Sequence, residues 1–331
     1  MKFKKCAALL LVSSCLLTGC TTSSAKKVDS KYVVASLEKG NKTKNIFADN
    51  LYKDIIDNSS NNSTVFNAVL QNLVDQKFPV NDDMKEDAAT IIKQIKSAYK
   101  SNYGDNYKDS LNQALTSAGY KNLSEYRQRM IKQIQYANFL LDYIDDHFDD
   151  VFNDYYQQCA PKYVSLIKIS VSDTSSPTDN ETSKLNEVKE LISNTDKSFG
   201  DIAQDYSDDS TSSKKGSLGI VDSKDTSGIA NSYGKDVFNA IESLSEGQVS
   251  DVITGDNGYY FVKVTSTDKK TLKKELKKTD IDSPLLAYDD YLQYVVYNSY
   301  KINYKDKDIK KIVQEVVNKA LEERKTERGE A

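Results

Sequence analysis

Apolar residues recur at helical spacing through the first half of the chain. Between Val28 and Pro161 they fall every three or four residues, which is the period of an amphipathic helix. Pro79 ends the first strong run, Asn81 is a favourable N-cap for the second, and Gly119 ends the third. The four clearest apolar stripes cover 65–74, 91–99, 107–115 and 126–144. This pattern predicts helices throughout 28–161.

The middle of the chain changes period. From Tyr163 to Val171 apolar residues alternate, so Ile167 and Ile169 share one face of a predicted strand and Lys168 lies on the other. Helical runs, a polar loop and two further apolar runs follow, at 185–192, 199–206, 207–219, 237–244, 249–253 and 259–264. The last two runs are joined through Asn257-Gly258, a strong hairpin signal. The order is therefore strand, helices, loop, helix and hairpin.

Helical patterns return after this region. Apolar stripes cover 285–296 and 309–317, and the lysine-rich run 269–278 is consistent with a charged helix or a linker. Residues 322–331 are highly charged, which predicts a frayed end. The chain is therefore expected to be α+β, with helical flanks at 31–161 and 267–331 around a mixed region at 162–266.

The first residues have the pattern of a secretion signal. Lysines at positions 2, 4 and 5 precede an apolar stretch at 7–17, too short to span a bilayer as a stable helix. Leu17-Thr-Gly-Cys20 resembles the bacterial lipobox, in which the cysteine carries the lipid. We expect a signal peptide at 1–19, lipidation of Cys20, a tether at 20–30, and a lipid-anchored protein on the extracytoplasmic face of the cell membrane. The alternatives are an ordinary cleaved signal or an uncleaved anchor.

Charge and rare residues exclude several classes of function. The formal net charge of −4 becomes −7 when the three signal-peptide lysines are removed, so nucleic-acid binding is not expected. Cys159 is the only cysteine besides Cys20 outside the signal, so no internal disulfide is expected. The single histidine, His147, fits a solvated acidic helix face better than a metal site or a triad. No cofactor motif is present in the sequence, and no cofactor is expected.

Three motifs in the mixed region resemble the parvulin family of peptidyl-prolyl isomerases. They are 199–209 with Gly216-Ser-Leu-Gly219, Leu244-Ser-Glu-Gly-Gln-Val-Ser250, and Gly258-Tyr-Tyr-Phe-Val-Lys-Val264. Residues 108–126, together with the lipobox, extend the resemblance to PrsA-type foldases, which are lipoproteins. The resemblance implies a discontinuous all-α chaperone-like domain at 31–161 and 267–331, with a parvulin-like α/β domain inserted at 162–266. In that inserted domain it implies a small antiparallel sheet surrounded by helices.

The resemblance also implies where a catalytic site lies. The two family histidines fall on Lys168 and Tyr260, and the family cysteine or aspartate falls on Asp209. We take Asp209, Lys168 and Tyr260 as candidate catalytic residues, with an Asp209–Lys168 ion pair and a hydroxyl from Tyr260. The candidate residues for the apolar substrate-binding wall are Leu218, Val237, Phe238 and Phe261.

The function implied by this resemblance is assisted folding of exported polypeptides, with peptidyl-prolyl cis-trans isomerisation. Because both family histidines are replaced, a holdase without isomerase activity is an alternative. A lipoprotein adhesin or capture module is another. Expected partners are unfolded exported polypeptides and the membrane, through lipid on Cys20. A homodimer is implied by the resemblance alone.

Overall fold

The computed structural model describes residues 27–39, 42–276 and 280–330. The predicted signal peptide and Cys20 lie outside these residues. The described chain divides into two compact units, one formed by residues 81–290 and the other by residues 27–80 with 291–330. The predicted domain boundaries at residues 161 and 267 stay predictions.

The discontinuous unit begins with strands and continues with helices. An antiparallel sheet of β1 (Lys27–Val28), β2 (Lys31–Lys39) and β3 (Lys42–Phe47) precedes α1 (Ala48–Ile56), α2 (Asn62–Lys77), α12 (Leu292–Ser299) and α13 (Lys307–Glu327). Phe66 on α2 is fully buried and stacks on Tyr294, with ring centroids 5.0 Å apart. Aromatic packing of this kind joins the two sequence segments of the unit.

Two predictions fail in this unit. The prediction of helix from residue 28 is wrong for the described residues of 28–47, which form β1, a turn, β2 and β3. The short strands pair within the sequence, as in Tyr32 with Lys27 and Val33 with Phe47, so local pairing overrides the apolar spacing. The predicted frayed end is also wrong up to Glu327, because α13 continues through it.

Four helices open the other unit, and the first three follow predicted apolar stripes. They are α3 (Asp82–Tyr103), α4 (Tyr107–Ser117), α5 (Leu123–Asp146) and α6 (Phe148–Cys159). The Asn81 side chain accepts a hydrogen bond from the Met84 amide at 3.0 Å, and Asn122 does the same for Glu125 at 3.0 Å. These caps satisfy helix-end donors and fix where α3 and α5 begin. The predicted N-cap at Asn81 is confirmed.

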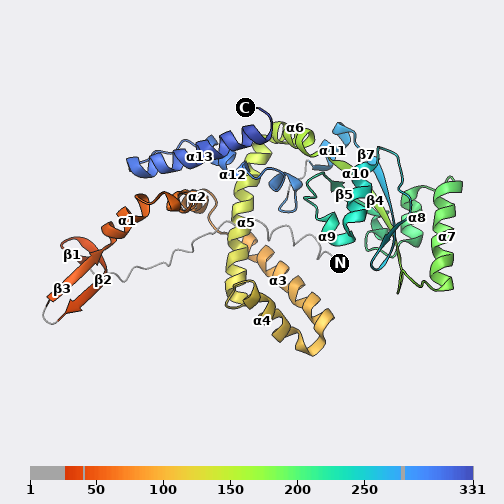
Figure 1. The fold of residues 1–331 in the computed structure, drawn as a ribbon, viewed down its shortest axis with the longest axis horizontal. Coiled ribbons are helices and arrows are strands. Elements are labelled where there is room, and N and C mark those ends of the chain that lie inside the picture. The colour runs from red at the N-terminus through yellow and green to blue at the C-terminus, as the bar shows by residue number, and fades with distance from the viewer. Residues whose placement is uncertain (1–26, 40–41, 277–279, 331) are drawn as a thin grey trace. The chain divides into compact units, whose positions relative to one another are not determined.

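The mixed region forms a four-stranded antiparallel sheet in the order β5-β4-β7-β6. Its strands are β4 (Lys162–Ser170), β5 (Ser217–Val221), β6 (Ile253–Gly255) and β7 (Gly258–Ser266). Its helices are α7 (Asp179–Asn194), α8 (Phe199–Tyr206), α9 (Ile229–Tyr233) and α10 (Lys235–Ser243), and α11 (Lys269–Leu276) follows it. Figure 1 shows α7 and α8 on one side of β4, and α9 and α10 on the other. The predicted α+β class with a small antiparallel sheet is confirmed.

Each face of this sheet has its own apolar core. Leu166 and Val262 pack on one face with α9 and α10, whereas Ile167 and Phe261 pack on the other with α7 and α8. Alternate residues of a strand point to opposite faces, so β4 and β7 supply both cores. The predicted face of Ile167 and Ile169 is confirmed.

Smaller differences concern turns and ends. β6 and β7 are joined by Asp256-Asn257, one residue earlier than the Asn257-Gly258 turn expected from the sequence. Helix α10 ends at Ser243, one residue before the end of the predicted run 237–244, and α9 was not predicted. Cys159 is buried, as expected of a small apolar residue, and forms no disulfide within the described chain.

In the described part of the chain, none of the helices is both long enough and apolar enough to cross a membrane. No group of three or more potential metal ligands occurs among the same residues.

Candidate functional site

Strand pairing brings two of the candidate catalytic residues together. Lys168 on β4 lies directly opposite Tyr260 on β7, and its ammonium nitrogen is 5.7 Å from the centroid of the tyrosine ring. A cation at this distance over an aromatic face is attracted by the ring quadrupole. The Tyr260 hydroxyl donates to Asn257 Oδ1 at 2.6 Å, so its proton is already engaged.

The third candidate, Asp209, reaches this pair through a residue that the sequence did not point to. Tyr233 on α9 donates a long hydrogen bond of 3.4 Å from its hydroxyl to Asp209 Oδ1. The Tyr233 ring packs edge-on against Tyr260, with centroids 6.2 Å apart. Asp209 also accepts a hydrogen bond from the Thr211 amide at 2.9 Å, which holds its carboxylate in place.

The expected ion pair between Lys168 and Asp209 does not form. Within the described chain no contact of 4.0 Å or less joins the two charged groups. Asp209 accepts from the Tyr233 hydroxyl instead, and Lys168 lies over the Tyr260 ring. We therefore correct the predicted pairing, while the catalytic roles of these residues stay predictions.

Burial keeps both tyrosines of the cluster in their neutral form. The pKa of Tyr233 is raised well above its usual range by burial and then by the nearby Asp209 carboxylate. Burial and Asp209 also raise the pKa of Tyr260. A phenol that resists ionisation remains a hydrogen-bond donor at neutral pH. The cluster therefore offers neutral hydroxyls and one ammonium group.

Three of the four residues predicted for the apolar wall lie beside this cluster. Val237 is buried in the same core as Tyr260, and Leu218 and Phe238 are partly buried against it. Phe261 does not belong there, because it packs on the opposite face with Ile167 and α8. Neighbouring residues of β7 point to opposite faces, so Tyr260 and Phe261 are unable to line one pocket. Phe261 is corrected to a core residue of the other face.

Polar contacts hold the helices that carry this wall. The Asp225 carboxylate accepts hydrogen bonds from the Ile229 amide at 2.5 Å and the Ala230 amide at 2.9 Å, so it caps α9. The Lys162 ammonium group donates to the carbonyls of Ile241 at 2.9 Å and Glu242 at 2.6 Å, at the end of α10. A cation is favourable there because the helix dipole is negative at its C-terminus.

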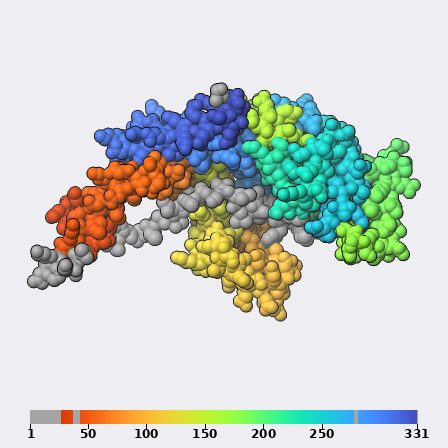
Figure 2. All heavy atoms as spheres, viewed as in Figure 1, coloured from red at the N-terminus to blue at the C-terminus, as the bar shows by residue number. Residues whose placement is uncertain are grey.

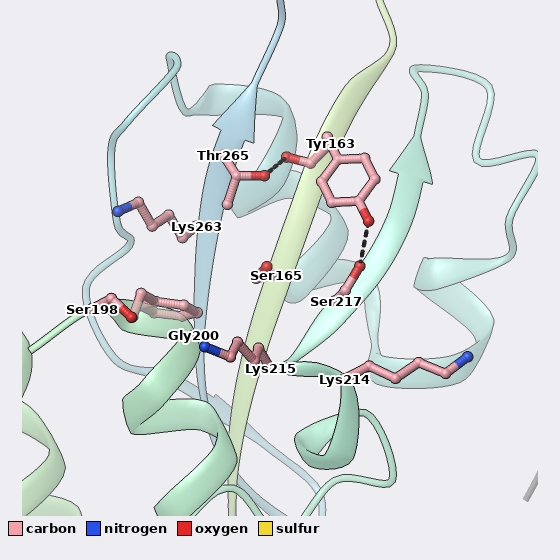
Figure 3. Close-up of a pocket in the computed structure, with 10 residues that line it drawn as sticks. Tyr163, Ser165, Ser198, Gly200, Lys214, Lys215, Ser217, Lys263 and Thr265 are labelled. Carbon is pink, nitrogen blue, oxygen red and sulfur yellow. Dashed lines mark hydrogen bonds between the residues drawn. The ribbon is translucent and has the colours of Figure 1, made fainter. Parts of the chain in front are cut away.

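A pocket of about 380 Å³ lies on the other face of the same strand pair. It is lined by residues of β4, β5 and β7 and by the start of α8, including Ser165, Ser217, Lys263 and Phe199. Figure 3 shows Ser165 at its centre, between Thr265, Tyr163 and Ser217 on one side and Ser198 and Lys215 on the other. The pocket was not expected from the sequence.

The chain is similar to known proteins. Residues 166–266 match the family model described as rotamase, the PPIC-type PPIase domain. Foldase protein PrsA of Staphylococcus aureus (strain bovine RF122 / ET3-1) is 31% identical over 159 residues, covering 46% of this chain and 47% of that protein. The chain resembles the PrsA-type foldases.

Other PrsA proteins match in a similar way. PrsA of Staphylococcus epidermidis (strain ATCC 12228 / FDA PCI 1200) is 35% identical over 136 residues, or 39% of either chain. The chain therefore spans about half, or less, of the length of the curated PrsA relatives it matches. The crystal structure of PrsA from Bacillus subtilis has a TM-score of 0.38 at 21% identity, covering 86% of this chain and 98% of that one. At that TM-score the structural likeness carries no further argument.

Proposed function

We propose that this chain is a foldase of exported polypeptides that binds prolyl segments on the Tyr260 face of its parvulin-like domain. The observation that carries the proposal is the meeting of a partly exposed apolar wall, Leu218 and Phe238, with the polar cluster of Lys168, Asp209 and Tyr260. A proline ring needs an apolar surface, and the peptide groups around it need polar partners. The PPIC-type match over 166–266 supports this assignment.

Isomerisation of a prolyl bond needs no covalent chemistry. The barrier of about 18–20 kcal/mol arises from the partial double bond of the amide, which is lost when the bond is twisted. A catalyst must bind the twisted amide better than the planar one. A donor directed at the prolyl nitrogen does so, because that nitrogen regains its lone pair on twisting. Lys168 is the donor of the cluster suited to this role, since the Tyr260 and Tyr233 hydroxyls already have acceptors.

The main alternative is a holdase that binds the same segments without isomerising them. It is favoured by the replacement of both family histidines by Lys168 and Tyr260, and by the missing ion pair with Asp209. Both readings use the same apolar wall, so peptide binding does not separate them and isomerisation does. An adhesin or capture module is a third reading, in which aggregation of unrelated clients is not suppressed.

We also propose the setting in which this function operates. Lysines before a short apolar stretch and the lipobox ending at Cys20 support export and lipid anchoring at the extracytoplasmic face of the membrane. Anchoring of this kind stabilises membrane binding by about 0.8 kcal/mol per buried methylene. Clients would then be exported chains that emerge unfolded. A homodimer is a further proposal, supported by the resemblance alone.

Isomerisation of a short X-Pro peptide by the full chain, kept soluble in a mild detergent, tests the catalytic part. We expect acceleration above the uncatalysed rate, and a loss of about 10- to 100-fold in kcat/KM for Lys168→Met. That range follows from a charged hydrogen bond of about 1.5–3 kcal/mol. Lys189→Met, on α7 at the other face of the sheet, is the matched control and should retain the parental rate.

A parent chain that binds the peptide without accelerating its isomerisation would be a holdase. Recovery of activity in a Lys168→His, Tyr260→His double variant would then show that the replacement of the two family histidines caused the loss. A parent chain that neither binds the peptide nor suppresses aggregation of several unfolded proteins would refute the foldase proposal altogether.

A further inference from the structure

The pocket on the second face is separate from the Tyr260 face. Ser165 and Lys263 lie on the same face as Ile167 and Phe261, whereas Lys168 and Tyr260 point the other way. The two sites share the strands β4 and β7 but have no lining residue in common. A ligand in this pocket does not compete with a prolyl segment for side chains.

The clearest sign of a ligand is a hydroxyl that faces the pocket without a partner in the described chain. Ser165 is only 7% exposed as a residue, and its hydroxyl makes no hydrogen bond to any described residue. The hydroxyl oxygen is not among the fully enclosed side-chain atoms that lack a partner, so it is open to the pocket, and Figure 3 places Ser165 in the middle of that pocket. Its neighbours along the same face of β4 include the apolar residues Ile167 and Ile169. A polar occupant would supply the hydrogen bond that the chain does not.

The charges of the lining residues favour a ligand of negative charge. The lining includes Lys214, Lys215 and Lys263 and no acidic residue. Lys215 forms an ion pair with Asp201 at 2.7 Å, outside the lining, whereas Lys214 and Lys263 have no ion pair with any carboxylate in the described chain. In a chain of formal net charge −4, this is a locally positive surface.

Backbone amides at the start of α8 also favour a ligand of negative charge. The pocket includes the first two residues of α8, Phe199 and Gly200, whose amides have no acceptor within the helix. The Ser198 side chain satisfies the amide of Asp201 at 3.1 Å and leaves those two without a described partner. The dipole at a helix start favours anions. The Ser165 hydroxyl, the lysines and the helix start are independent observations that agree.

We propose that this pocket binds a carboxylate of an acidic peptide segment. The Phe199 ring and the lysine stems supply apolar contact for the methylenes of a glutamate side chain, and the hydroxyls and amides face its carboxylate. Hydroxyl and amide donors bind carboxylate and phosphate oxygens alike, so the two sources must be distinguished by experiment. The domain would then hold an acidic segment on one face and a prolyl segment on the other. This proposal does not depend on isomerase activity.

Isothermal titration of the full chain in mild detergent, at about 50 mM salt to limit screening, tests the proposal. The probes are hexaglutamate, hexaglutamine and inorganic phosphate. We expect hexaglutamate to bind at one site and hexaglutamine not to bind. Lys263→Gln should weaken hexaglutamate at least fivefold. Lys235→Gln, which removes a lysine from α10 on the other face, should change the affinity less than twofold.

Ser165→Ala separates a ligand-binding role from a structural one. Since the hydroxyl has no partner in the described chain, its removal should leave the thermal unfolding temperature unchanged or raised, yet weaken hexaglutamate at least threefold. Equal binding of the two peptides, or unchanged affinity in both Lys263→Gln and Ser165→Ala, would overturn the proposal. Saturable binding of phosphate without binding of hexaglutamate would reassign the pocket to a phosphate group and overturn the peptide assignment.

Discussion

Removal of the Lys162 ammonium group should loosen the helix that carries the apolar wall. Besides the carbonyls of Ile241 and Glu242, this group binds the carbonyl of Leu244 at 3.0 Å, so three acceptors at the end of α10 share one cation. In Lys162→Met the carbonyls of Glu242 and Leu244 lose this donor, and the apolar side chain offers no replacement. The Ile241 carbonyl keeps the Leu244 amide at 3.3 Å, so the loss falls mainly on the other two.

The magnitude follows from the number and kind of these bonds. A hydrogen bond from a charged group contributes about 1.5–3 kcal/mol net, and the dipole at a helix end about 0.3–1 kcal/mol more. Three full bonds would overstate the loss, because Glu242 and Leu244 are only partly buried and water reaches their carbonyls in the variant. We expect the free energy of unfolding to fall by about 2–4 kcal/mol. For a unit the size of residues 81–290, that corresponds to a fall of about 5–15 °C in Tm.

Thermal unfolding followed by circular dichroism measures this loss in the full chain. Lys235→Met is the matched control, because it removes a lysine from the N-terminal end of the same helix. A cation at that end opposes the helix dipole, so the control should be neutral or more stable by a few tenths of a kcal/mol. If Lys162→Met unfolds within 1 °C or so of the parent, the three hydrogen bonds contribute nothing and the reasoning fails.

Three further changes test other parts of the structure. Tyr155→Phe should cost about 1.5–3 kcal/mol by equilibrium unfolding in urea, because the buried hydroxyl donates at 2.8 Å to the buried Asp222 carboxylate; a neutral outcome would contradict this. Hydrogen bonds from the Thr178 amide and the Ser172 amide lower the pKa of Glu181 to about 2 from an ordinary 4.5. The contribution of its carboxylate to the free energy of unfolding is therefore complete above pH 4.5 and is lost as pH falls through about 2. Urea midpoints between pH 2 and pH 7 should show that Glu181→Gln removes this part of the pH dependence, and parallel curves would refute it. Gly216→Ala should cost about 2–5 kcal/mol by the same urea assay, because its φ is +75° and an added Cβ would lie 2.5 Å from a β4 carbonyl oxygen, whereas Gly119→Ala, with φ of +84° and open space, should cost only about 1–2 kcal/mol.

Local signals in the sequence predict local features well. The Asn81 cap and the stripes of α2 to α5 follow from side-chain chemistry within a few residues, and the structure confirms them. The strand β4 follows from its period of two. The strands at residues 27–47 escaped prediction because their pairing, rather than their apolar spacing, decides the conformation.

The candidate site mixes local and long-range information. The pairing of Lys168 with Tyr260 depends on the register of β4 and β7, which sequence similarity carried correctly. Phe261 was misplaced although strand alternation alone sets it on the face opposite Tyr260. Tyr233 was missed because α9 is only five residues long; Ile229 and Tyr233, four apart between two glycines, are the signal that points to it. No local pattern reveals the Ser165 pocket, since its lining is assembled from three strands and a helix end.

The segment from β1 to α1 has a surface that the rest of its unit does not cover. Apart from residues 37–42, whose side chains the structure does not describe, no residue between Lys27 and Ser60 is buried, and Tyr32, Val34, Ile46 and Leu51 are among the large apolar side chains left exposed. Figure 2 shows this segment, in red to orange, with its atoms open on the drawn face. Backbone amides held only by such a sheet exchange with solvent deuterium through local opening, at a free energy far below that of global unfolding. Slowed deuterium uptake in this segment would therefore report directly when a partner covers it.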